Sequence, residues 1–166
     1  MLKPLSLLTF LIATTCIFQS KLAQANVDKC KELKTDCEYY LCIEAQKKCG
    51  SKGYLKSFGH KYCQRFEMRS DTYFSLSTQK WIQQTKNCLI KKIDSFSSEK
   101  TSCKELRVKA FSSHVSCYVD AGFCEIDKKE KKKIYKIIGA AKLQPRIIKA
   151  GLQIRKSCRS RRKLDL

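Results

Sequence analysis

Cysteine is the residue whose number and spacing could do chemistry in this chain of 166 residues. Cys16 lies in an apolar N-terminal stretch, and ten more cysteines follow at positions 30, 37, 42, 49, 63, 88, 103, 117, 124 and 158. Ten thiols on mostly helical segments predict five disulfide bridges. Structural zinc sites place paired ligands roughly two to four residues apart, often with histidine. Only the Cys37/Cys42 gap comes near this spacing, and His60 and His114 stand alone, so we expect no metal and no cofactor.

The first 25 residues predict the compartment. Lys3 gives a short positive start, an apolar stretch follows, and Ala23-Gln24-Ala25 has the small-x-small form of a cleavage site. The apolar stretch is shorter than the roughly 20 residues that span a bilayer. We therefore expect residues 1–25 to be a signal peptide that is removed, and the protein to be secreted and extracellular. A lipoprotein anchor at Cys16 is a minor alternative, because Thr14-Thr15 makes a poor lipobox.

The charge balance is strongly basic, with 35 Lys and Arg against 15 Asp and Glu and a net charge of +20. Loss of the leader removes Lys3 and Lys21 and no acidic residue, which leaves +18. Such an excess destabilises a small domain by self-repulsion. Disulfides, each worth typically about 2 to 4 kcal/mol, are a plausible counterweight. By length, residues 26–158 are expected to form one domain.

Apolar residues recur with helical spacing along most of the chain. Asp28 is a candidate N-cap for a first helix, and Gly50 is a stop signal for it. Residues 54–62 then predict an irregular or short-helical connection. Further on, the serines from Ser75 to Ser77 offer caps for a longer helix around Trp81.

Three more start signals divide the second half. Ser102 and the glutamate three positions later have the form of a capping box. We expect this helix to break at Ser112-Ser113, with a new segment from His114. Asp127 starts a further helix, and Pro145 suits the first position of the last one. Because no long stretch alternates with a strand period, we expect an all-α, disulfide-stapled bundle of short helices in a single domain.

Catalytic groups are sparse. The run from His114 to Tyr118 is superficially similar to secreted phospholipase A2, in which a His-Asp pair beside a cysteine activates water. Here no aspartate follows His114 and no glycine-rich calcium loop precedes it, so both the orienting acid and the metal would be lacking. We expect His114 to be a partly exposed residue at a helix start and His60 to lie on the surface. With every mature cysteine paired, no thiolate is free as a nucleophile, and we expect no enzyme.

The order of the cysteines resembles stanniocalcin, a family of secreted hormones, over residues 30–158. The full pattern is Cys-x6-Cys-x4-Cys-x6-Cys-x13-Cys-x24-Cys-x14-Cys-x13-Cys-x6-Cys-x33-Cys. The cluster Cys37-EYYL-Cys42, the Gln79-Lys80-Trp81 helix before Cys88, and Cys117-Tyr118-VDAGF-Cys124 also resemble the family. The resemblance implies hormone activity in calcium and phosphate balance, through a receptor or another extracellular protein target.

The resemblance also implies a pairing that spacing alone does not give. It pairs Cys30 with Cys42, Cys37 with Cys63, Cys49 with Cys103, Cys88 with Cys117, and Cys124 with Cys158. The chain departs from the family in a longer gap before Cys63, in having no Asn-x-Ser/Thr sequon, and in lacking a further cysteine that links two chains. We therefore expect a monomer or a non-covalent dimer. A different cysteine-rich helical scaffold with coincident spacing is the alternative.

Basic side chains concentrate towards the C-terminus, where fifteen Lys and Arg lie between Lys128 and Lys163 with Glu130 as the sole acid. Such a face can bind sulfated glycans, anionic membrane surfaces or nucleic acid through counterion release. Export makes nucleic acid an unexpected partner. The alternative function is thus a cationic effector on anionic surfaces, and the plain alternative is a solvated lysine-rich surface. Residues 159–166 are expected to be a disordered basic tail. The candidate polyanion-binding residues are Lys131, Lys132, Lys133, Arg159, Arg161, Arg162 and Lys163.

Overall fold

The computed structural model describes residues 30, 32–98 and 100–164 of the chain. The chain divides into two compact units, Met1–Leu33 and Lys34–Leu166. In the first unit, the Leu33 amide donates to the carbonyl of Cys30 at 3.1 Å. The expected signal peptide at residues 1–25 lies outside the described residues, and so does the Asp28 cap.

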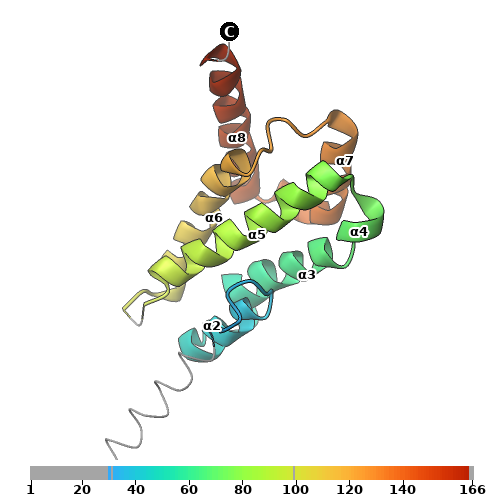
Figure 1. Cartoon of the computed structure of the whole chain (residues 1–166). Helices are drawn as coiled ribbons and strands as arrows, with labels where there is room; N and C mark the ends of the chain where they lie inside the picture. The colour runs from blue at the N-terminus through green and yellow to red at the C-terminus, as the bar shows by residue number, and fades with distance from the viewer. Residues whose placement is uncertain (1–29, 31, 99, 165–166) are drawn as a thin grey trace, which may run out of the picture. The chain divides into compact units, whose positions relative to one another are not determined.

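The second unit begins with short helical elements (Figure 1). They are α2 (Tyr39–Lys47), the π-helix η1 (Leu55–His60), α3 (Lys61–Glu67) and α4 (Ser70–Tyr73). Lys48 ends α2 in the left-handed region with φ 52°, and Gly50 follows with φ 80°. The predicted stop near Gly50 is therefore confirmed, because glycine adopts this φ without steric cost.

The π-helix η1 occupies most of the predicted irregular or short-helical connection over residues 54–62, so the short-helical alternative is confirmed. It packs on α2 where Gly59 meets the ring of Tyr40. A Cβ atom at position 59 would lie 2.5 Å from Tyr40 Cδ1, far inside van der Waals contact. The missing side chain of Gly59 thus allows the two elements to approach, and it lets Tyr40 reach the interior, where it is buried.

Two long helices form the centre of the second unit: α5 (Leu76–Phe96) and α6 (Cys103–Asp120). In Figure 1, α6 runs back along α5 after a short loop. Each helix begins at a predicted serine cap, since the Ser75 hydroxyl accepts from the Thr78 amide and the Ser102 hydroxyl accepts from the Glu105 amide. These caps satisfy amides that would otherwise lack an intrahelical partner.

The predicted break at Ser112-Ser113 is wrong, because α6 is continuous from Cys103 to Asp120. The two hydroxyls donate to carbonyls three residues back, Ser112 to Lys109 and Ser113 to Ala110, at 2.8 Å each. Serine breaks helices by competing for backbone groups, and here that capacity is used within the helix itself. His114 consequently lies in the body of α6 instead of at a helix start.

The last elements are α7 (Lys128–Ile138), the 3-10 helix η2 (Gly139–Leu143) and α8 (Pro145–Leu164). The predicted Asp127 cap is confirmed, since its side chain accepts from the Glu130 amide at 2.9 Å. Pro145 is the first residue of α8, as predicted.

The expectation of a disordered tail is wrong for residues 159–164, which are the last turns of α8 (Figure 1). The Cys124–Cys158 disulfide anchors this end of the helix. Beyond it, Arg161 donates to the Val119 carbonyl at 3.2 Å and also pairs with Asp120. These contacts with the end of α6 stabilise residues 159–164 as helix, although their basic composition alone favours a solvated, disordered segment.

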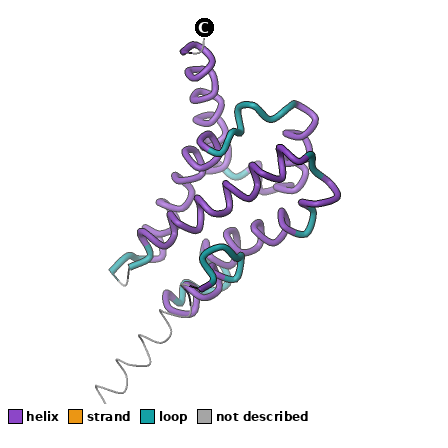
Figure 2. Tube along the Cα trace, in the orientation of Figure 1, coloured by secondary structure: helices purple, strands orange, loops and turns teal. Residues whose placement is uncertain are grey.

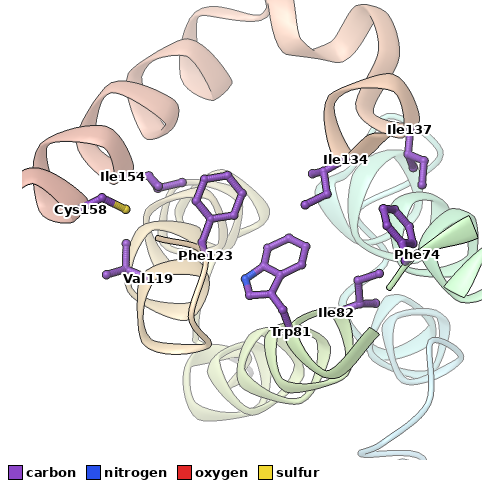
Figure 3. Packing of buried hydrophobic residues seen from close by; sticks show 9 residues of the cluster. All are labelled: Phe74, Trp81, Ile82, Val119, Phe123, Ile134, Ile137, Ile154 and Cys158. Atoms are coloured by element: carbon purple, nitrogen blue, oxygen red, sulfur yellow. The ribbon is translucent and has the colours of Figure 1, made fainter. Parts of the chain in front are cut away.

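The described residues contain helices and no strand (Figure 2), so the all-α prediction is confirmed. None of the described helices has the length and apolar character needed to cross a membrane. Figure 3 shows how Trp81 of α5, Phe123 of the loop after α6 and Ile134 of α7 point toward one region from different elements. The buried cluster is Phe74, Trp81, Ile82, Val119, Phe123, Ile134, Ile137, Ile154 and Cys158.

Four disulfides join these elements, with Cα–Cα distances between 5.3 and 5.6 Å. They are Cys37–Cys63, Cys49–Cys103, Cys88–Cys117 and Cys124–Cys158, and each coincides with a pair that the stanniocalcin resemblance implies. Cys30 and Cys42 are disulfide-bonded as well. Their assignment to each other stays a prediction.

Candidate ligand-binding cavity

The seven candidate polyanion-binding residues do not form one free surface. Lys131 donates to the Cys124 carbonyl at 3.2 Å, and its ammonium lies 5.1 Å from the Phe123 ring centre. Lys133 pairs with Glu130 at 2.6 Å, and Arg161 is held by Asp120. The remaining four are exposed: Lys132, Arg159, Arg162 and Lys163.

Glu130 connects the start of α7, where it lies, with the start of α5 at Ser75. Its Oε2 accepts from the Ser75 amide at 3.0 Å, while its other oxygen pairs with Lys133. Burial opposes ionisation of Glu130, but the hydrogen bonds from Lys133, Ser75 and Thr78 outweigh it and lower its pKa to about 2. Lys133 and Glu130 are therefore bonded to each other within the fold, and neither is a free surface charge.

Both histidines differ from their expected positions. His60 is partly buried and bonds Glu38 at 2.8 Å, so it is not a free surface residue. His114 is 8% exposed, and its Nδ1 donates to the Ala110 carbonyl at 2.7 Å. Burial lowers the pKa of His114 to about 4, and the Ala110 bond offsets this only in part. His114 is thus a neutral interior side chain near pH 7.

One group of side chains has metal-ligand geometry within the described residues. The sulfurs of Cys37 and Cys63 and a carboxylate oxygen of Glu67 lie within 4.8 Å of one another. The two sulfurs are bonded to each other, however. Neither is a thiolate, so this group offers a metal one carboxylate only.

A cavity of about 580 Å³ opens in the second unit. It lies within the roughly 300 to 1,000 Å³ of typical small-molecule sites. Its walls come from α2, η1, α3, α5, α6, α7, η2 and α8 together with the loop around Phe123. The cavity is thus lined by residues that are far apart in the sequence, and no single sequence motif predicts it.

Aromatic rings form one wall of this cavity. Phe58 lies 4.8 Å from Phe111 and 4.6 Å from Tyr62 between ring centres, and Tyr54 lies 5.2 Å from Phe111. His114 stacks into the same group, 5.9 Å from Phe111. Tyr118 connects this group to Trp81, since its ring centre lies 5.5 Å from that of His114 and 5.1 Å from that of Trp81. Trp81 also lines the cavity, and its ring nitrogen donates to the Tyr118 carbonyl at 3.2 Å.

Three tyrosines that line the cavity, Tyr40, Tyr54 and Tyr118, are uncharged near pH 7. Burial raises the pKa of Tyr118 to about 12, and burial likewise raises the pKa values of Tyr40 and Tyr54. Thr85 also lines the cavity, and its buried hydroxyl has no hydrogen-bond partner among the described side chains and backbone. A ligand segment inside this space would meet aromatic carbon and neutral polar atoms.

The mouth of the cavity differs from its interior. Apolar side chains of α7 and α8 are exposed there, including Tyr135 at 47%, Ile148 at 48% and Leu152 at 62%. Cations also contribute to the lining: Lys86, Lys128, Lys131, Lys142, Arg155 and Arg162. An apolar interior that opens between exposed apolar and cationic side chains is suited to an amphipathic ligand.

No family model, curated protein or solved structure matches this chain. The sequence predicted a helix around Trp81, yet it gave no reason to expect a cavity beside that helix. The one available signal was the apolar character of Ile148 and Leu152 on a strongly basic helix, because exposed apolar groups often mark binding sites.

Proposed function

We propose that the protein is a secreted, non-enzymatic binding protein whose ligand site is the cavity of about 580 Å³. The observation that carries the proposal is the cavity itself, with an aromatic interior and exposed apolar residues at its mouth. Pockets of this size with few convergent polar groups are the usual form of ligand sites. The ligand would be small and largely apolar.

The disulfides support this role because they keep the cavity walls in place. Cys88–Cys117 joins α5 to α6, and Cys124–Cys158 joins α8 to the loop after α6. A site held open before binding loses less conformational entropy when the ligand enters. Several disulfides also suit an oxidising, extracellular compartment.

The stanniocalcin resemblance adds a signalling role to the proposal. In this role the rigid helical surface binds a receptor or another extracellular protein, with calcium and phosphate balance as the implied process. Its support is the cysteine order and the four coinciding disulfides. Cavity occupancy and receptor binding are compatible. The ligand would lie inside the cavity, and the receptor would contact the exposed faces of α7 and α8 around its mouth.

The cavity is tested with a neutral fluorescent probe. N-phenylnaphthylamine brightens in apolar sites, and we expect saturable brightening with one probe bound per oxidised chain. Gly151 lines the cavity on α8 and has open space where a Cβ would stand. We expect Gly151→Phe to block the mouth and weaken binding, while Gly151→Ala retains it. Absence of brightening, or equal binding by Gly151→Phe, would overturn the proposed function.

The exposed positions of Lys132, Arg159 and Lys163 favour a second candidate, a cationic effector that binds sulfated glycans or anionic membranes. Heparin chromatography tests it, because binding through counterion release weakens as salt rises. Elution above physiological salt that is lost on charge reversal at these three positions would support it. Elution below physiological salt would exclude it.

A further inference from the structure

We propose that the ligand is a single-chain amphiphile whose anionic head group pairs with Arg155 and Arg162 while its hydrocarbon chain enters the cavity. This inference rests on the proposed function and names the chemical class of the ligand. The head group is a carboxylate or a phosphate monoester, since each can accept two parallel hydrogen bonds from one guanidinium through two of its oxygens.

The interior of the cavity selects for a hydrocarbon chain. Its wall around Tyr54, Phe58 and Phe111 consists of close aromatic rings. His114 is neutral there at pH 7 because burial lowers its pKa to about 4. Among the described lining residues the one acidic side chain is Glu67, which is exposed and pairs with Lys86. A charged group in this interior would lose its hydration without a partner, whereas a methylene chain would gain about 0.8 kcal/mol per buried group.

Arg155 and Arg162 lie on the cavity side of α8. They are seven residues apart, with the lining residue Cys158 between them, so all three share one helix face about two turns long. Both side chains are exposed, and no carboxylate pairs with either of them in the described part of the chain. Two guanidinium groups therefore stand at the mouth with their donors available.

Lys131 lies close enough to Arg162 for their positive charges to repel each other, although two carboxylates also act on Lys131. Burial lowers the pKa of Lys131; Glu125 and Asp127 act in the opposite direction, and Arg162 lowers the pKa further by repulsion. Lys128 also contributes to the lining and has no carboxylate partner among the described residues. An anionic head group between these cations would relieve the repulsion, while a cationic one would add to it.

The test compares ligands with one chain and different head groups. Trp81 is the sole tryptophan of the chain and lines the cavity, so its emission reports binding. We expect dodecanoate and dodecyl phosphate, below their micelle concentrations, to bind at least about tenfold more tightly than dodecanol, as one added ion pair allows. Dodecyltrimethylammonium should bind more weakly than dodecanol. Preference between the two anions identifies a carboxylate or a phosphate as the favoured head group.

The matched variants use neighbouring positions on the same helix. Arg155→Glu/Arg162→Glu reverses the two mouth charges, and Lys156→Glu/Lys163→Glu makes the same charge change on exposed residues that do not line the cavity. We expect the first variant to lose the preference for anions, with dodecanol binding unchanged, and the second to behave like the original protein. Equal loss in both variants would overturn the inference by showing a general charge effect.

Failure of the inference is distinguishable from failure of the proposed function. If dodecanol binds as tightly as dodecanoate, the cavity is a ligand site and the anion preference is wrong. If none of the four dodecyl compounds changes Trp81 emission or competes with N-phenylnaphthylamine, both are wrong.

Discussion

Thr85 has a buried hydroxyl for which the described residues provide no hydrogen-bond partner. On the same helix, the Thr78 hydroxyl is fully buried and accepts from the Ser75 hydroxyl at 3.1 Å. Replacing threonine by valine removes the hydroxyl and nearly retains the shape. The decrease in unfolding free energy should therefore depend on whether the replaced hydroxyl made a hydrogen bond.

We expect Thr85→Val to leave stability unchanged or to raise it by up to about 1 kcal/mol, because an unsatisfied polar group disappears. Thr78→Val should lower stability by about 1 to 3 kcal/mol, since Ser75 and Glu130 lose a partner. Urea unfolding of the two variants measures the difference. If Thr85→Val proved as costly as Thr78→Val, its hydroxyl would have a bonded partner after all.

His114 gives the fold a defined pH dependence. Burial lowers its pKa from 6.5 to about 4 in the folded protein. Below pH 6.5 the unfolded chain therefore binds a proton that the folded chain does not, and stability falls as the pH is lowered towards 4. The shift corresponds to about 3 kcal/mol between pH 7 and pH 4.

We expect His114→Gln to flatten the slope of unfolding free energy against pH between about 6.5 and 4. His60→Gln leaves His114 in place, so the contribution of His114 to the slope should be retained. Glu130, whose bonds with Lys133, Ser75 and Thr78 lower its pKa to about 2, loses its contribution only below pH 4.5. Urea unfolding at a series of pH values measures these slopes. An unchanged slope in His114→Gln would contradict the burial of a neutral imidazole.

At the scale of elements, α6 offers two serines with opposite functions. Ser102 caps the helix by accepting from the Glu105 amide at 3.2 Å, while Ser112 donates to a carbonyl within the same helix. Both are exposed, so loss of packing does not separate them. A cap satisfies an orphan amide, whereas an internal serine competes with the backbone.

We expect Ser102→Ala to cost about 1 kcal/mol in unfolding free energy. Ser112→Ala should be neutral or stabilising by up to about 0.5 kcal/mol, because alanine is the better helix former. Thermal and urea unfolding followed by circular dichroism measures both. A large loss in Ser112→Ala would indicate that α6 depends on this serine for a local irregularity.

The same contrast explains which elements the sequence could predict. Caps at Ser75, Ser102 and Asp127 are local signals, and each marks a helix start in the structure. The extension of α8 through residues 159–164 depends on Arg161 contacts with Asp120, far away in sequence. The cavity is still less predictable, since Tyr54, Trp81 and Ile154 line it from separate elements. Long-range packing carries that information, and no short motif contains it.

For the whole molecule, the Cys49–Cys103 disulfide closes the longest of the four loops, with a sequence separation of 54. It connects the end of α2 to the first residue of α6. Removing a cross-link frees the unfolded chain, typically at a cost of about 2 to 4 kcal/mol. We expect Cys49→Ser/Cys103→Ser to unfold at lower urea concentration by an amount in this range. An unchanged midpoint would mean that the bridge adds nothing to stability.

The excess of positive charge opposes the compact state of the whole molecule, with 35 basic and 15 acidic residues. Salt screens this repulsion, since the Debye length falls from about 30 Å at 0.01 M to about 8 Å at 0.15 M. Exposed ion pairs such as Lys109–Glu105 weaken at the same time, but each is worth only about 0 to 1 kcal/mol. The unfolding free energy should therefore rise over this salt range.

Replacing two exposed lysines on different helices tests whether net charge causes the expected rise of unfolding free energy with salt. Lys132→Glu/Lys156→Glu changes the formal charge of the chain from +20 to +16, because each replacement removes one positive charge and adds one negative charge. We expect this variant to be more stable than the original protein at low salt and to gain less when salt is added, since less repulsion remains to be screened. Urea unfolding at the two salt concentrations measures both effects. An equal gain from salt in the two proteins would show that ion binding at particular sites, and not overall repulsion, stabilises the fold.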